Sequence, residues 1–576
     1  MRLCLKVLLG LVLVTLFLFG LILLIAFPLG IFPAILKHRL QLTQDNNTVT
    51  SYWQHLPMDS YYDFYLFNTT NPDEIEFFGM KASVLEVGPY SFKEHENKDN
   101  LAYLEHNERV FFQNDKQWIY NPATSCKTCS YDDEFVLPNA AYMAVSNIGK
   151  QHHINKINRL LLDMSLLMLG EYPYRKVPMK GVLFESYNDP LIATMHSKFF
   201  QDDIPSFLNR TIEQILGFPT PDIDFIGYFP KYNNTHDESY VVKTGKTNTA
   251  DLNAIVNWAG SPKLQWWGDD YSNDLQGTTD GSFNKPFPEK TDTYRIFRSF
   301  SCRTFPMHYE KDATVSGVDG YVFRISPDAY NTELEVNKGY RFDNEFNKNY
   351  FPNWPCKGNP IPQPSNNTDC STVDCFMPEN YCAACCSGST IRGKVYLPPG
   401  LVALKCFPGH NKSMPIPAMI SPPHFVDSPS EVSNSIIGLN PIRSKHNTGH
   451  FTLQTYTGNA IDARFRLQLS IPIYQDDDLT SLNNMRSSMI PCFWLEVRVS
   501  LLQYAIDYLH TNTTIIPKAI LGIGVGLTAL SCIVATLYIY CMIRQRRRNS
   551  ASEFTEFERF TKPVSHPETW SSNPQY

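Results

Sequence analysis

The feature that most constrains this chain is an uncharged apolar run near its C-terminus, from Ala519 to Ile543. At about 1.5 Å per residue, a helix of this length exceeds the roughly 30 Å hydrocarbon core of a bilayer. An arginine-rich block, Arg544 to Arg548, follows directly, and clustered basic residues stay on the cytosolic side. We therefore predict a transmembrane helix over residues 515–543 and a cytosolic tail over residues 544–576.

A second apolar run, Val7 to Phe27, follows a short leader over residues 1–6. A cleaved signal peptide is the alternative interpretation, but its apolar core is usually only about 7–15 residues long and precedes a small-residue cleavage site. Here the apolar character continues to Leu36, interrupted only by two prolines and a glycine. We predict an uncleaved transmembrane helix over residues 7–36 with a cytosolic N-terminus.

The asparagine sequons fall between these two runs, and none lies in the tail. This distribution indicates that the intervening chain is outside the cytosol, because N-glycosylation marks luminal or secreted surfaces. The chain would then cross the membrane twice, with a glycosylated outer domain over residues 37–514 between the two spans. The predicted glycosylation sites are Asn46, Asn68, Asn209, Asn233, Asn366, Asn411 and Asn512.

The composition allows a full core outside the membrane. The chain has 576 residues, of which 43% are hydrophobic, and we find no internal repeat that would divide it. A net charge of −7 gives no nucleic-acid signature. Alternating segments such as Phe465-Arg466-Leu467-Gln468-Leu469 are typical of half-buried strands. Val84 to Val87 predicts a short strand that ends at a turn in Gly88-Pro89. The fold class is therefore α+β, mostly antiparallel.

Eleven of the fourteen cysteines lie in the predicted outer domain, where disulfides form and persist. Because eleven is odd, at least one of them should be free or paired with another chain. The Cys126-Lys127-Thr128-Cys129 motif predicts a local disulfide, with thiol redox chemistry as the alternative. The cysteine-rich region 302–406 predicts a subregion held together by disulfides, with a zinc site as the alternative. The disulfide candidates are Cys126, Cys129, Cys302, Cys356, Cys370, Cys375, Cys382, Cys385, Cys386 and Cys406.

The best helical stretch runs from Ala140 to Leu169, and a short helix is predicted over Ser206 to Leu216. Apolar residues recur at helical spacing in the first stretch, namely Ile154, Ile157, Leu161 and Met164. This pattern has two interpretations that periodicity cannot separate. The helix packs on the core, or it offers an apolar face to a ligand or to lipid.

A search for catalytic constellations finds no G-x-S-x-G elbow and no H-E-x-x-H motif. Gly245-Lys246-Thr247 resembles the end of a phosphate loop, but Tyr240 stands where the first glycine is required. Gly522, Gly524 and Gly526 lie inside the last apolar run, where small residues allow close helix contact. We predict neither an enzyme nor a metal or organic cofactor.

Several short motifs, in their shared order, resemble the class B scavenger receptor family over nearly the whole chain. The motifs are Asn71-Pro72 with Phe77 and Gly79, Glu86-Val87-Gly88-Pro89-Tyr90, Asn188-Asp189-Pro190, Ser301-Cys302-Arg303, Pro422-Pro423-His424-Phe425, Gly438-Leu439-Asn440-Pro441 and Trp494-Leu495-Glu496. Two terminal spans that enclose one large glycosylated domain are also the layout of this family.

The resemblance implies a flattened antiparallel β-barrel capped by an apical helical bundle over about residues 140–216. In this family the bundle binds ligands, and an apolar tunnel leads from it toward the bilayer. Ile154, Ile157, Leu161 and Met164 would then be ligand-binding residues at the apex. The implied function is a cell-surface receptor for lipids, lipoproteins or other apolar or polyanionic ligands, with a receptor for a protein cargo as the alternative.

The resemblance also bears on the membrane-proximal cysteines and on localisation. Cys4 and Cys541 stand where the family carries acylated cysteines, and unmodified cysteines are the alternative. The tail has no leucine and so lacks the di-leucine signal of the lysosomal relative. We therefore expect the plasma membrane rather than the lysosomal membrane, and contacts between membrane spans could support an oligomer.

Overall fold

The computed structural model describes residues 2–26, 31–45, 47–151, 155–195, 226–229, 232–344, 389–391 and 394–560. The chain forms two compact units. The terminal unit comprises Met1–Leu36 and Leu509–Tyr576, and the central unit comprises Lys37–Tyr508.

The terminal unit is built from α1 (Arg2–Ala26), the start of α2 (Ile31–Arg39) and α13 (Ile516–Phe560). Gly20 and Gly524 lie where α1 meets α13. A Cβ atom on Gly20 would lie 2.6 Å from Thr528 Oγ1, and one on Gly524 would lie 3.1 Å from Leu23. These glycines therefore allow the two helices to pack closely.

One helical stretch, Gln503–Ala551, is long and apolar enough to cross a membrane among the residues that the structure describes. It contains the predicted span over residues 515–543, and α13 continues beyond the arginine block to Phe560. The apolar part of α1 is shorter, Gly10–Ile25. The first span, over residues 7–36, therefore remains a prediction.

The central unit contains a thirteen-stranded sheet in which every neighbouring pair is antiparallel. Its main path runs β7-β6-β3-β2-β1-β17-β16-β15-β10-β9-β8, and β14 pairs with β16 and β13 off this path. The strands are β1 (Met58–Thr69), β2 (Val84–Leu104), β3 (Arg109–Tyr120), β6 (Thr235–Lys243), β7 (Ile255–Trp258), β8 (Thr293–Arg298), β9 (Arg303–Val315), β10 (Val318–Ile325), β13 (Val402–Ala403), β14 (Met419–Ser421), β15 (Gly449–Gln454), β16 (Ala460–Ile473) and β17 (Ser488–Leu501). The predicted α+β class with antiparallel strands is confirmed.

The two edge strands of this sheet are joined by the segment Thr278–Thr279. Ile255 N on β7 donates to Thr278 O at 2.7 Å, and Thr279 N donates to Arg295 O on β8 at 3.2 Å. Phe297 N on β8 donates back to Thr279 O at 2.8 Å. Backbone groups of both edges are therefore hydrogen-bonded within the chain rather than open to another strand.

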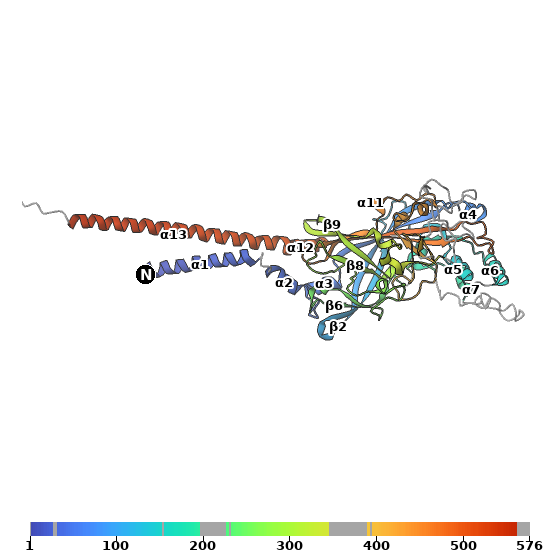
Figure 1. Cartoon of the computed structure of the whole chain (residues 1–576), viewed down its shortest axis with the longest axis horizontal. Helices are drawn as coiled ribbons and strands as arrows, with labels where there is room; N and C mark the ends of the chain where they lie inside the picture. Colours follow the sequence, from blue (N-terminus) through green and yellow to red (C-terminus); the bar gives the residue numbers. More distant parts are fainter. Residues whose placement is uncertain are drawn as a thin grey trace, which may run out of the picture. The chain divides into compact units, whose positions relative to one another are not determined.

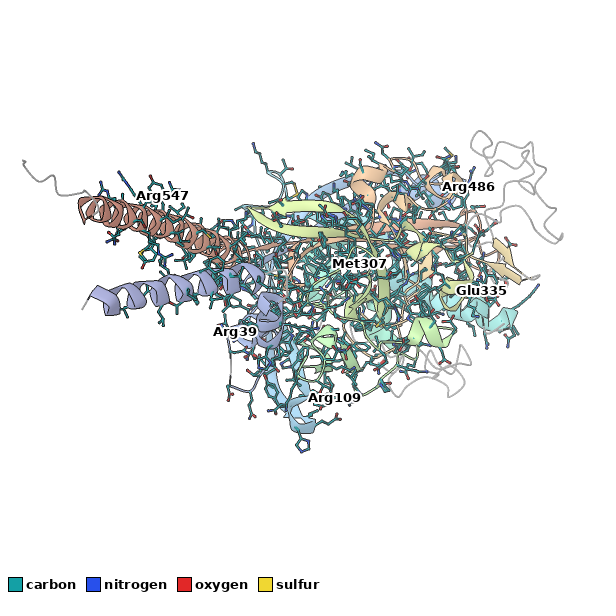
Figure 2. The ribbon with its side chains drawn as sticks, turned by 60° about the vertical axis from the view of Figure 1, so that its left-hand side comes forward. Arg39, Arg109, Met307, Glu335, Arg486 and Arg547 are labelled. Carbon is teal, nitrogen blue, oxygen red and sulfur yellow. A yellow bond between two sulfur atoms is a disulfide. The ribbon has the colours of Figure 1, made fainter. Side chains whose placement is uncertain are left out.

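Aromatic side chains fill the core of the central unit. Phe64 on β1 is fully buried and meets Phe92, Phe184 and Phe493 edge to face, with ring centroids 5.5–5.8 Å apart. Such pairs add about 0.5–1.5 kcal/mol each to the free energy gained from burying their area. Met307, which is labelled in the middle of this unit, is also fully buried (Figure 2).

The prediction of a short strand that ends at Gly88-Pro89 is wrong. β2 runs from Val84 to Leu104 without a break, and its register against β1 shifts between Phe64 and Leu66. A Cβ atom on Gly88 would lie 2.9 Å from Tyr65 Cα, so glycine allows the strands to approach at this irregularity. The Gly-Pro pair marks a β-bulge here and not a turn.

Four helices gather at one end of the central unit, and α3 (Thr48–Gln54) and the start of α12 (Gln503–His510) lie at the other end (Figure 1). The four are α4 (Pro72–Phe78), α5 (Ala140–Gln151), α6 (Lys156–Met168) and α7 (Pro190–Met195). A two-stranded antiparallel sheet of β4 (Glu134–Pro138) and β5 (Tyr174–Pro178) flanks α5 and α6 along the chain. The stretch predicted as one helix over Ala140 to Leu169 forms two helices, α5 and α6. The helix predicted over Ser206 to Leu216 lies outside the described residues.

The remaining described helices and strands are short and lie in the connections of the central unit. They are α9 (Asp270–Asn273), α10 (Ser430–Asn434), α11 (Arg443–His446), β11 (Ser389–Ile391) and β12 (Lys394–Tyr396).

Candidate ligand-binding surface

Helix α6 leaves a broad apolar face exposed to solvent. Met168 is 79% exposed, Ile157 71% and Met164 51%. Leu160, Leu161 and Leu167 are exposed beside them. An apolar face of this extent on the surface of a folded unit is typical of a binding site.

Polar contacts on the opposite side of α6 explain why this face stays exposed. Arg159 forms ion pairs with Asp476 and with Asp478, the latter at 3.1 Å. Asp163 accepts hydrogen bonds from the backbone N and the hydroxyl of Thr480, at 2.8 and 2.6 Å. The segment after β16 therefore holds one side of the helix and turns the apolar side outward.

Helix α4 adds aromatic side chains beside the same segment. Phe77 is 61% exposed, Phe78 75% and Met80 52%. A Cβ atom on Gly79 would lie 2.6 Å from Asn484 O, so α4 also lies against the connection between β16 and β17. We call the exposed apolar side chains of the two helices, together with Met80 just after α4, the apex surface. Its members are Phe77, Phe78, Met80, Ile157, Leu160, Leu161, Met164, Leu167 and Met168.

The structure places three of the four predicted apex residues, Ile157, Leu161 and Met164, on the exposed part of α6. Ile154 lies outside the described residues. Of the two interpretations of the stretch 140–169, packing on the core describes α5, whose first eight residues are buried. An exposed apolar face describes α6. Sequence reasoning missed the contribution of α4, although two adjacent phenylalanines before a glycine were a usable signal.

Among the residues that the structure describes, Cys126 is bonded to Cys129 and Cys302 to Cys406. Cys492 on β17 is a buried free thiol, and Tyr228 donates a hydrogen bond to its Sγ at 3.3 Å. Burial raises the pKa of this thiol to about 12, so it is protonated and poorly reactive. Six further candidates lie outside the described residues: Cys356, Cys370, Cys375, Cys382, Cys385 and Cys386.

The candidate modification sites have different surroundings. Asn68 accepts a hydrogen bond from Val136 N, and Asn233 bonds to both backbone groups of Trp118. Asn411 and Asn512 are partly exposed. Cys541 is an exposed free thiol on α13, and Cys4 lies in α1. Glycosylation and acylation remain predictions, and Asn46, Asn209 and Asn366 lie outside the described residues.

Four motifs that are far apart in the sequence meet in one buried cluster. His424 Nε2 lies 2.5 Å from Glu86 Oε2, to which Trp494 Nε1 donates at 3.2 Å. Asn440 N donates to His424 Nδ1 at 3.1 Å, so Nε2 carries the proton and donates to Glu86. The ring of His446 stacks on His424 with centroids 4.0 Å apart. The motifs therefore hold β2, β17 and two connections together.

The pKa values of Glu86 and His446 in this cluster are both lowered. Burial disfavours the Glu86 carboxylate, but the hydrogen bond from His424 and the positive charge of Lys445 lower the pKa of Glu86 overall. Burial, together with the nearby His424 and Lys445, lowers the pKa of His446 to about 3. His446 is thus neutral in the folded protein down to strongly acidic pH.

We expect His446 to make the fold sensitive to acid. The unfolded chain binds a proton here near pH 6.5 and the folded chain near pH 3, so the stabilisation is complete above the first value and is lost as pH falls toward the second. At about pH 4.5, two units below the unfolded value, the loss amounts to about 2.7 kcal/mol. His446→Gln should remove this part of the acid sensitivity of the thermal unfolding midpoint, measured on the full chain in nanodiscs. An unchanged pH profile in the variant would contradict the assignment.

The central unit has a large antiparallel sheet and an exposed apolar surface, and the chain also has a helix able to cross a membrane. This combination is typical of a membrane receptor. The chain belongs to the CD36 family, whose model matches residues 11–542. Members of this family, the class B scavenger receptors among them, are membrane receptors.

Three relatives illustrate the range of this family. The protein R07B1.3 of Caenorhabditis elegans is 31% identical over 506 residues, which cover 86% of this chain and 88% of that protein. Scavenger receptor class B member 1 of Bos taurus is 21% identical over 523 residues, covering 90% and 86%. Lysosome membrane protein 2 of Mus musculus is 23% identical over 493 residues, covering 84% of each.

Proposed function

We propose that this chain is a plasma-membrane receptor that binds lipids, lipoproteins or other apolar or polyanionic ligands at the apex surface and passes lipid to the membrane. The observation that carries the proposal is the set of nine exposed apolar side chains on α4, just after it at Met80, and on α6. They lie at the end of the central unit opposite α3 and α12 (Figure 1). A particle bound there buries apolar area worth roughly 25 cal/mol per Å².

The route for lipid would lie inside the sheet. The hydrogen bonds of Thr278–Thr279 to both edge strands support a closed barrel, and membership of the CD36 family supports a conduit within it. A lipid that leaves water gains about 0.8 kcal/mol for each CH₂ group that becomes buried, and an enclosed path keeps that gain during transfer. No covalent chemistry is required.

The membrane arrangement belongs to the same proposal. Both termini would be cytosolic, the central unit would be outside, and the first span would be formed by α1. Gly522 and Gly526 on α13 have open space beside them, which supports contact with a span of a second copy.

The experiment is lipid transfer by the full chain in nanodiscs. Purified lipoprotein with a fluorescent lipid is added, and lipid arriving in the disc is followed together with particle binding. Binding with transfer supports the proposal. Binding of the particle without transfer of lipid would exclude the conduit from the proposal. If neither occurs, the apex surface would instead be tested as a site for a protein cargo.

A further inference from the structure

A charged chamber lies among the strands of the central unit, away from the apex surface. Its volume is about 90 Å³, enough for several water molecules. Side chains from both halves of the sheet line it, including Glu94 on β2, Asp237 on β6 and Ala463 on β16. Its charged lining suits a small polar group better than an acyl chain.

The chamber carries an excess of one negative charge. Four carboxylates line it, namely Glu94, Glu96, Asp237 and Asp280. Three cations compensate them: Lys116 and Arg298 on the wall, and Lys98 behind it. Lys116 Nζ lies 3.6 Å from Asp237 and 3.9 Å from Glu94, so it attracts both carboxylates without a close hydrogen bond to either.

Three buried acceptor atoms on the wall have no hydrogen-bond partner in the described structure: Glu94 Oε1, Asn114 Oδ1 and Asp237 Oδ1. Their residues are 8%, 2% and 0% exposed. Two buried donors of the chamber also have no hydrogen-bond partner in the described structure, Arg298 Nε on the wall and Lys98 Nζ behind it, and Lys116 Nζ lies 3.6 Å or more from the carboxylates that it faces. Leaving buried polar atoms unpaired costs about 1–3 kcal/mol each, so an occupant should satisfy them.

We propose that this chamber binds a primary ammonium group, with Glu94 Oε1, Asn114 Oδ1 and Asp237 Oδ1 as the acceptors. A primary ammonium has three N–H donors, no acceptor and one positive charge, which matches the unpaired acceptors and the charge excess. The rings of Tyr62, Tyr240, Phe297 and Phe451 on the wall favour a cation further. The same chemistry is offered by a small free amine and by the headgroup of an amine-bearing lipid.

Solvent reaches the chamber, because the side chains of Glu96 and Asp280 are 16% and 22% exposed. A proton competes with the ammonium group for the carboxylates of the chamber. Burial raises the pKa of Asp237 to about 6 against the opposing effect of Lys116, and burial also raises the pKa of Glu94. The groups that face Asp237 are Lys116 on β3, Glu94 and Glu96 on β2, Tyr240 on β6, and Tyr232, Arg298 and Ser299. Below about pH 6 a proton removes the charge excess, so ammonium affinity should fall.

The test uses the full chain in nanodiscs of phosphatidylcholine, titrated with ethanolamine by calorimetry. Saturable binding of one ethanolamine per chain is expected near neutral pH, with at least about fivefold weaker binding at about pH 5. Asn114→Ala should weaken binding about tenfold, because one charge-assisted hydrogen bond is lost. Because Asn114 Oδ1 has no hydrogen-bond partner in the described structure, we expect this variant to fold, and a thermal melt checks that it does. Asp237→Asn should weaken binding at least as much, and Asp270→Asn, on the surface, should leave it unchanged.

A second arm distinguishes the sources of the ammonium group. Discs that also contain phosphatidylethanolamine are examined by native mass spectrometry. Retained phosphatidylethanolamine that ethanolamine displaces would assign the lipid headgroup, and ethanolamine binding without it would assign a free amine. The proposal is overturned if choline, which has no N–H donor, binds as tightly as ethanolamine, if folded Asn114→Ala binds normally, or if neither arm shows binding. None of these outcomes bears on the apex surface.

Discussion

Replacing Leu161 and Met164 together with aspartate should reduce lipoprotein binding at least about tenfold, because each apolar side chain contributes about 1.5–3 kcal/mol when it is buried by a ligand. The new carboxylates would also have to be desolvated in the complex. Both positions are exposed, at 39% and 51%, so the fold should tolerate the change. Binding of labelled lipoprotein to cells with equal surface amounts of each variant measures the effect.

The matched control is Lys156→Asp, which adds a carboxylate to an exposed polar position on the same helix. It should bind lipoprotein nearly as well as the original chain. Equal losses in the control and in the double variant would show that charge alone is responsible, and normal binding by the double variant would exclude the α6 face as the contact.

Removing the Cys302–Cys406 disulfide with a double alanine substitution should lower the free energy of unfolding by about 4 kcal/mol. The two cysteines are 104 residues apart, and a crosslink across so long a loop restricts the unfolded chain strongly. The bridge also lies at the core, where both cysteines are fully buried and Trp267 Nε1 donates to Cys302 O at 2.8 Å. The measurement is denaturant unfolding of the full chain, followed by tryptophan fluorescence.

The comparison variant is the double alanine substitution at Cys126 and Cys129. These residues are separated by 3 positions, so the same loop-closure argument gives a cost of only about 2 kcal/mol. The ranking of the two variants is the critical result. If removing the short bridge costs as much as removing the long one, closure of the long loop does not account for the stability.

The membrane helix and the antiparallel class could be predicted because their signals are local. Hydropathy identifies Ala519 to Ile543, and a period of two residues identifies β16. The break between α5 and α6 could not be predicted from apolar spacing, because both helices have apolar residues at helical spacing. Likewise, Gly88-Pro89 gives the same local signal in a turn and in a β-bulge, and only the approach of Tyr65 on β1 distinguishes them.

The pairing of Cys302 with Cys406 and the meeting of Glu86, His424 and Trp494 depend on contacts between distant parts of the chain. The charged chamber has the same origin, since Glu94, Asn114 and Asp237 come from three strands whose register sets which side chains face inward. The sequence by itself determined which helix is apolar enough to cross a membrane and several of the segments that form strands, because these depend on the hydropathy of neighbouring residues. The tertiary structure alone decided which apolar side chains remain exposed and which charges are enclosed, because burial depends on what packs against each residue from elsewhere in the chain.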